Sequence, residues 1–373
     1  MEDALLKLVS AALFGVPCDI PLTDEIRQEA KKQTVSSLLE ADWRVLSRNM
    51  QVLHEHLALH ELLTGAGIPY VILKGYASSL YYPEPDRRPL GDVDFLVDPA
   101  DLERTDRLLR SKGYAPDPEV NDHHSKYTHN GVPVEMHRTL NGLPQNAAGD
   151  AARRYLADAI RDAAETPVHE SVLMLPSPFH HGLITLLHIA KHMTFTGTGL
   201  RHLCDWAVFV NSVEDFPAMF RQAFEEIGVW EFAKQLTAVC CRYIGLPPQP
   251  WTGGYPEARL EALIQDILGS GNFGNKKDTK YQFVMLDSLN RDGTLNGGST
   301  FRAMTRNISS IAKENWTACA KHPVLLPAGW IYVCTRYAWR VLTRKRKLVT
   351  RNTFREADRR RELYTGFRLY EKQ

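Results

Sequence analysis

The most constraining feature of this sequence is a short apolar strand with one acidic residue inside it and a second acidic residue just before it. Residues 91–97 read Gly-Asp-Val-Asp-Phe-Leu-Val. Side chains alternate between the two faces of a strand, so Asp92 and Asp94 project from the same face. Two adjacent carboxylates repel each other unless a cation lies between them, and Mg²⁺ prefers carboxylate oxygens together with substrate phosphates. The pattern therefore predicts a divalent metal site at this strand.

A phosphate-binding turn is predicted just upstream. Residues 70–73 form a short strand-like run, Lys74 and Gly75 follow as a turn, and a helix is expected over residues 76–82. The start of a helix offers unpaired backbone N–H groups and the positive end of a dipole, which attract phosphate. Lys74 adds a point charge, and the sequence leaves two alternatives open for it, which are contact with a ligand and a structural ion pair. This segment is therefore expected to hold the phosphates of a nucleotide.

Two side chains that follow the turn are further candidates for nucleotide binding. Ser78 lies within the expected helix, and Arg88 lies at the end of a proline-rich loop. For Arg88 the sequence leaves two alternatives open, which are contact with a phosphate and an ion pair with Asp86.

A third acid is expected from a later strand. Residues 131–137 read Gly-Val-Pro-Val-Glu-Met-His, with apolar side chains on one face and Glu135 and His137 on the other. A neighbouring strand with this alternation would aim Glu135 at the acid pair. Three other acids lie nearby in sequence and remain alternatives: Asp117, Glu119 and Asp122. Three acids around one or two metals, beside a phosphate turn, suit in-line phosphoryl or nucleotidyl transfer.

These residues resemble the nucleotidyltransferase superfamily of the polymerase-β type, in which a strand and glycine turn precede two acids on one strand and a third on another. The sequence is more similar still to an uncharacterised bacterial nucleotidyltransferase family. The matching motifs lie between about residues 70 and 206: Leu73-Lys74-Gly75, Tyr82-Pro83-Glu84-Pro85-Asp86-Arg87-Arg88, residues 91–97, His123-His124, residues 134–138, residues 188–192 and residues 200–205.

The resemblance implies roles for four of these residues. Asp92 and Asp94 would be metal ligands, Glu135 a third ligand or a base, and Gly75 would lie at the triphosphate. The chain departs from the superfamily at one position, because Gly75 is followed by Tyr76 where the superfamily has Gly or Ser. The group that holds the γ-phosphate is therefore left open.

Several histidines are candidates for substrate contact. His188 and His192 lie four residues apart on an expected helix, a spacing that can bind a metal. No Glu follows His188, so the metalloprotease pattern is absent, and packing or substrate contact by His192 is favoured over metal binding. His124 and His137 are the other two candidates.

Composition and periodicity set the expected architecture. Of the 373 residues, 44% are hydrophobic and 24% are charged, which is typical of a globular protein and excludes a disordered one. We expect an α+β fold, with a small mixed β-sheet core flanked by helices and a C-terminal α-helical domain. The expected parts are an N-terminal helical segment (1–62), a catalytic core (63–175), a helical acceptor-binding domain (176–320) and an aromatic and basic C-terminal segment (321–373).

The C-terminal segment is the most unusual part of the sequence. Residues 336–361 contain eleven Lys or Arg and two acids, and an aromatic block precedes and overlaps them. This composition is typical either of a solvated helix surface or of contact with an anionic membrane surface, with nucleic acid a less favoured partner. Residues 1–17 lack the features of a signal peptide. We expect a cytoplasmic protein, with peripheral membrane contact as an open alternative.

The motifs together predict a magnesium-dependent nucleotidyltransferase, with Mn²⁺ as an alternative metal. It would move a nucleoside monophosphate from a nucleoside triphosphate such as ATP to an acceptor hydroxyl and release pyrophosphate. A small molecule or a glycan or lipid intermediate is the favoured acceptor. The alternatives are a toxin-like enzyme that modifies protein or RNA, and a scaffold that binds nucleotide without turnover.

Overall fold

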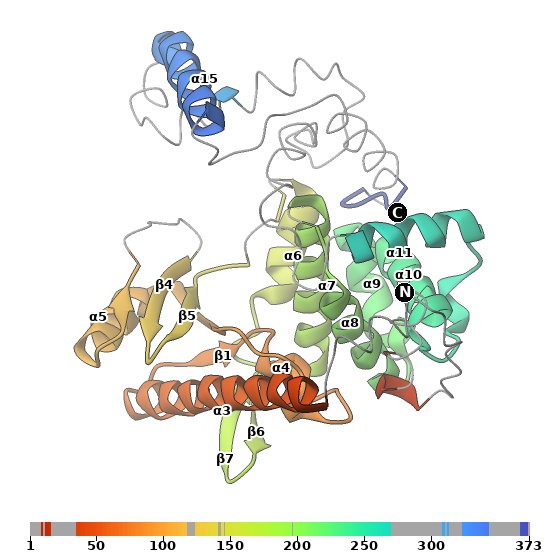
Figure 1. Ribbon diagram of the computed structural model, residues 1–373, viewed down its shortest axis with the longest axis horizontal. Coiled ribbons are helices and arrows are strands. Elements are labelled where there is room, and N and C mark those ends of the chain that lie inside the picture. Colours follow the sequence, from red (N-terminus) through yellow and green to blue (C-terminus); the bar gives the residue numbers. More distant parts are fainter. Residues whose placement is uncertain are drawn as a thin grey trace.

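The computed structural model contains a small mixed β-sheet and a group of packed helices (Figure 1). It describes residues 35–117, 124–140, 143–144, 146–195, 197–269, 323–342 and 366–371, and also residues 9, 12–15, 308–309 and 312. The elements of the first half are α3 (Val35–Gly65), β1 (Tyr70–Ile72), α4 (Tyr76–Ser79), β2 (Val93–Val97), α5 (Leu102–Ser111), β3 (Ala115–Pro116), β4 (His124–His129) and β5 (Val132–His137).

The sheet has five strands in the order β1-β2-β5-β4-β3. Strand β2 pairs antiparallel with β1 and parallel with β5, and β5 pairs antiparallel with β4. A two-residue turn joins β4 to β5, and its residues Asn130 and Gly131 both have positive φ angles, 48° and 75°. A turn of this kind matches the twist of the strands it joins and fixes their register. The mixed α+β class expected from the sequence is confirmed.

The two faces of the sheet bury different partners. On one face Ile72 and Phe95 pack with Val52 and Leu59 of α3, and the hairpin of β6 (Ala164–Val168) and β7 (Ser171–Leu175) completes this core. In Figure 1, α3 runs alongside the sheet. On the other face, the alternate side chains Val71, Leu73 and Leu96 form a small apolar cluster. They pack with Ile184 of helix α7 (Pro178–Phe195). Asp94 shares this second face because it alternates with Phe95.

The remaining helices pack around a second, larger core. They are α6 (Ala147–Leu156), α7, α8 (Leu200–Ser212), α9 (Phe216–Ile227), α10 (Trp230–Val239) and α11 (Glu257–Gly269). Trp206 and a set of phenylalanines are fully buried there, and their rings meet edge-on or tilted: Phe209, Phe216, Phe220 and Phe224. The C-terminal Phe367 and Tyr370 join this core, and the Tyr370 N–H donates to the Gly228 carbonyl at 2.7 Å.

Local boundaries differ from the sequence expectations in places. Helix α4 ends at Ser79 and not at Tyr82. A 3-10 turn, Pro99–Asp101, precedes α5, and the Asp98 carboxylate accepts the Ala100 N–H at 2.8 Å. Packing also unites α3 with the sheet and places α6 in the helical core. The domain boundaries at residues 62, 175 and 320 stay predictions.

The described part of the C-terminal segment is a 3-10 turn, Pro323–Leu325, followed by α15 (Leu326–Leu342). Several large apolar side chains of α15 are exposed: Trp330, Ile331, Tyr332 and Trp339. Most of the basic residues that follow lie outside the described residues. Among the helices that the structure describes, none has the length and apolar character needed to span a membrane.

We predict that Gly182→Ala destabilises the helical core. A Cβ at Gly182 in α7 would lie 2.5 Å from Phe209 Cε1 and 2.5 Å from Phe220 Cζ, and both rings are fully buried. Overpacking of this kind costs about 1–3 kcal/mol, which exceeds or offsets the roughly 1 kcal/mol gain in helix propensity. The measurement is urea unfolding. Gly65→Ala is the control, because a Cβ there meets nothing within 4 Å, and it is expected to unfold at no lower urea concentration than wild type. Equal unfolding midpoints for Gly182→Ala and Gly65→Ala would contradict the prediction.

Candidate functional site

Strand pairing places two of the predicted acids side by side. In the parallel ladder between β2 and β5, Asp94 is the register partner of Glu135. His137 lies two residues further along β5 and shares the face of Glu135. One ligand atom from each of these three side chains lies within 4.8 Å of the others. Two carboxylates and an imidazole therefore converge on the sheet face that α7 covers.

Asp92 lies at the entrance to β2 and interacts strongly with Asp94. The charge of Asp94 raises the pKa of Asp92, and partial burial raises it further. Glu135 also contributes to this rise. A raised carboxyl pKa means that the negative charge on Asp92 is unfavourable in the metal-free protein. A bound cation would relieve this repulsion.

Asp94 is buried and held between two basic groups. Lys74 Nζ lies 2.8 Å from Asp94 Oδ2, and His137 Nε2 lies 2.7 Å from Asp94 Oδ1. Burial by itself would raise the pKa of Asp94, but Lys74 and His137 overcome this effect and hold the pKa well below its usual range. Glu135 has a cationic partner too, since Lys126 Nζ lies 2.7 Å from Glu135 Oε1. Without metal, the protein's own side chains balance the charge of the acids.

The predicted phosphate turn lies next to the acids. Gly75 has a φ of 54°, and a Cβ added there would approach the Asp92 carbonyl oxygen at 3.9 Å. Its neighbour Lys74 contacts Asp94, as described above. Ser78 is different, because only 2% of it is exposed within the four-residue helix α4. The structure thus brings Lys74 and Gly75 to the acids and leaves Ser78 buried.

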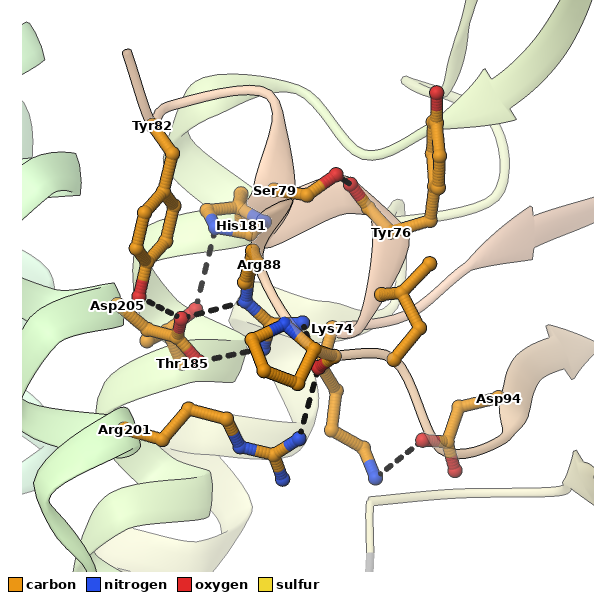
Figure 2. A network of polar contacts seen from close by, with 12 residues as sticks. Lys74, Tyr76, Ser79, Tyr82, Arg88, Asp94, His181, Thr185, Arg201 and Asp205 are labelled. Carbon is orange, nitrogen blue, oxygen red and sulfur yellow. Dashed lines mark hydrogen bonds and ion pairs between the residues drawn. The ribbon is translucent and has the colours of Figure 1, made fainter. Parts of the chain in front are cut away.

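Arg88 lies in a buried ion pair (Figure 2). Its Nε and Nη2 atoms each lie 2.7 Å from a carboxylate oxygen of Asp205 on α8, and the Tyr82 hydroxyl donates to the same carboxylate at 2.7 Å. The Arg88 partner is therefore Asp205 and not Asp86. The Arg88 carbonyl accepts a hydrogen bond from Asn49 of α3 at 2.9 Å. Arg88 ties the loop before β2 to both α3 and α8.

Helices α7 and α8 bring further basic residues that sequence reasoning missed. Lys191 is largely buried; burial and the charge of Lys74 lower its pKa, while Glu135 and Asp94 oppose the shift, so Lys191 lies within electrostatic range of the acids. Arg201 Nη1 donates to the Pro89 carbonyl at 3.2 Å, and Asp92 is among the acids that act on its pKa. Figure 2 shows the side chains of Arg201, from α8, and Lys74, from the turn after β1, pointing toward the same region. Lys191 and Arg201 both lie in motifs that carry the family resemblance, residues 188–192 and 200–205. Their place next to the acids, however, depends on how α7 and α8 pack.

Three histidines gather beside Lys74. His188 and His192 lie one turn apart on α7, and His202 reaches them from α8. Burial lowers the pKa of His202 to about 4, and burial followed by the charge of Lys74 lowers the pKa of His188 well below its usual value. His202 was not singled out from the sequence. His124 begins β4 as the register partner of His137, and its side chain lies outside the described residues.

Comparison with protein families identifies this protein as a nucleotidyltransferase. A family model described as an uncharacterised nucleotidyltransferase matches residues 19–245, more than half of the chain, and the protein belongs to this family.

The other two comparisons add little. The search of curated proteins found no match to the chain. Among solved structures, an antigenic nucleotidyltransferase-like protein from Paracoccidioides brasiliensis is 17% identical over 49% of this chain and 93% of its own, with a TM-score of 0.27. A superposition this loose carries no argument about the site.

We predict that Asp205→Ala strongly destabilises the protein, because it leaves the buried Arg88 guanidinium without its carboxylate. Breaking one partner of a buried ion pair costs about 3–5 kcal/mol. Urea unfolding measures the loss, and Asp205→Asn separates the loss of charge from the loss of volume. Glu225→Ala is the control because it removes an exposed partner of Arg221 at 2.8 Å, a pair worth no more than about 1 kcal/mol. Equal losses for Asp205→Ala and Glu225→Ala would show that the buried pair does not stabilise the fold.

Proposed function

We propose that this enzyme transfers a nucleoside monophosphate from a nucleoside triphosphate, with ATP as the first candidate, to an acceptor hydroxyl. The observation that carries the proposal is the pairing of Asp94 with Glu135 on one sheet face, next to Asp92, whose backbone lies beside the turn at Gly75. In the reaction the acceptor oxygen attacks the α-phosphorus, its proton passes to Glu135, and the bond to the β-phosphate oxygen breaks. Pyrophosphate leaves.

The donor atoms at this site fit Mg²⁺, with Mn²⁺ as an alternative. Asp92 and Asp94 would hold the metal, and Glu135 would complete the ligand set with hard carboxylate oxygens. When bound, the metal neutralises charge on the phosphate oxygens. The raised pKa of Asp92 supports this assignment, because the charge on its carboxylate is unfavourable beside Asp94 and a bound cation would offset that repulsion. Lys74, the counter-ion of Asp94 in the metal-free chain, is within reach of the same region.

The triphosphate would lie against the basic groups that border the acids. Lys74 comes from the turn after β1, Lys191 from α7 and Arg201 from α8. Together they supply positive charge on the side of the acids that faces the helices. This arrangement gives the helical region a part in nucleotide binding, in addition to the acceptor binding proposed for residues 176–320. His137 and His192 remain candidates for substrate contact.

The acceptor is proposed to be a small molecule or a glycan or lipid intermediate. A screen of the four nucleoside triphosphates for pyrophosphate release, with cell-extract fractions as acceptors, tests this. Labelled protein or RNA in place of a small product would favour the toxin-like alternative. Magnesium-dependent nucleotide binding without pyrophosphate release would favour a scaffold.

We predict that Asp92→Asn abolishes nucleotidyl transfer and weakens Mg²⁺ binding without lowering the melting temperature of the metal-free protein. The change removes a carboxylate whose charge is already unfavourable next to Asp94, so the metal-free fold loses nothing. Asp94→Asn is a poorer test, because it leaves the partly buried Lys74 without its partner. Pyrophosphate release and calorimetric Mg²⁺ titration are the measurements.

Asp98→Asn is the matched control for Asp92→Asn. It makes the same chemical change at the other end of β2, where Asp98 is exposed and caps the following turn. Asn caps helices about as well as Asp. Activity and melting temperature should both stay at the wild-type level. Full activity of Asp92→Asn would overturn the proposed role of the acid pair.

We also propose that α15 and the basic residues after it contact anionic membrane surfaces. The support is the set of exposed aromatic residues on α15 directly before the charged run. Deleting the segment is a poor test, since Phe367 and Tyr370 pack in the helical core.

We predict that Trp339→Ser weakens co-sedimentation of the full chain with vesicles that contain anionic lipid, because it removes an exposed aromatic side chain next to the basic run. Trp43→Ser is the matched control: both tryptophans are 67% exposed, but Trp43 lies on α3. Equal binding by the two variants would remove the membrane proposal.

A further inference from the structure

Three imidazoles from two helices meet in one place outside the acid cluster. The ring centroids of His188 and His192 are 4.3 Å apart, and His202 lies 5.4 Å from the first and 5.0 Å from the second. One ring nitrogen from each of the three lies within 4.8 Å of the others. The sequence showed only the pair on α7, which by itself favours packing; α8 supplies the third ring.

A second, independent observation points to a ligand at this cluster. His202 is only 6% exposed, and its Nδ1 atom has no hydrogen-bond partner among the residues that the structure describes. A buried polar atom left without a partner costs about 1–3 kcal/mol. Such an atom next to two further imidazoles is typical of a site that is completed by something outside the chain.

We propose that His188, His192 and His202 bind a transition-metal ion, with Zn²⁺ as the favoured ion. Neutral imidazoles suit Zn²⁺, and three histidines with an open fourth position form a common zinc ligand set. Zn–N bonds of about 2.0–2.1 Å place tetrahedral ligand atoms roughly 3.3 Å apart, a spacing that ring nitrogens within 4.8 Å of one another reach with at most small side-chain rotations. The nearby carboxylates prefer a hard ion such as Mg²⁺, so the two sites differ in chemistry.

The charges around the histidine cluster favour a negatively charged fourth ligand. Lys74 and Arg88 act on these histidines, but each also lies 2.7–2.8 Å from a carboxylate, that of Asp94 or Asp205. Lys191 and Arg201 add further positive charge. A zinc ion in these surroundings would favour an anion, such as hydroxide or a phosphate oxygen, at its open position. The proposal does not depend on the proposed nucleotidyl transfer.

The test measures zinc on the full chain and needs no assay of activity. The protein is stripped with a chelator, incubated with Zn²⁺ in excess Mg²⁺ to occupy the carboxylates, and desalted. Elemental analysis should give one zinc per chain, and competition with a chromophoric chelator gives its affinity. His192→Ala and His202→Gln are each expected to weaken that affinity by about 100-fold or more, since even residues that only support a ligand cost 10–100-fold.

Two control variants locate the zinc. His169→Asn removes an exposed histidine of the β6–β7 hairpin, and Asn tolerates the positive φ of 50° there, so zinc binding should not change. Asp94→Asn disrupts the cluster of Asp94, Glu135 and His137, which is the other set of suitable donor atoms among the residues that the structure describes. Zinc affinity should survive this change. Loss of zinc in Asp94→Asn but not in His192→Ala would overturn the proposal.

The wild-type protein provides a readout that does not require a folded variant. Four-coordinate Co²⁺ absorbs strongly in the visible range, and the paramagnetically shifted imidazole protons of the Co²⁺ form count the histidine ligands by NMR. Three such histidines support the site. A wild-type chain that retains no Zn²⁺, or a Co²⁺ form with fewer than three histidine ligands, would refute it.

Discussion

The parallel pairing of β2 with β5 is the constraint on which the rest of the site depends. It sets Asp94 opposite Glu135 with Asp92 close by, and so concentrates negative charge on a sheet face that a helix covers. The chain neutralises this charge with its own cations, Lys74 on Asp94 and Lys126 on Glu135. These ion pairs offset the repulsion between the acids in the folded protein.

Strand alternation couples this polar site to two apolar cores. Odd and even residues of β1 and β2 point to opposite faces, so Phe95 joins the core under α3 while Leu96 packs with Ile184 of α7. Asp94 therefore faces the helical region. The buried pair of Arg88 and Asp205 fastens the loop before β2 to α8. The packing of α7 on the sheet and the ion pair with α8 also bring the basic and imidazole side chains of both helices to the acids.

Much of the sheet and of the acid set was predictable because both rest on local rules. Period-two alternation predicted the strand at residues 93–97 and a second strand with Glu135, and the pairing of these strands places Glu135 beside Asp94. Other expectations were altered by packing. Arg88 pairs with a residue 117 positions away, which no local pattern predicts, and Ser78 is buried within a helix shorter than expected.

The sequence by itself determined which residues carry charge, which segments form strands and helices, and membership of a nucleotidyltransferase family. Those properties follow from side-chain chemistry and from interactions within a few residues. Only the tertiary structure decided that Lys74 neutralises Asp94, that Arg88 binds Asp205, and that His202 joins the pair on α7. Each of these contacts joins elements distant in sequence, and their meeting depends on strand register and on the way buried helices pack, which short motifs do not encode.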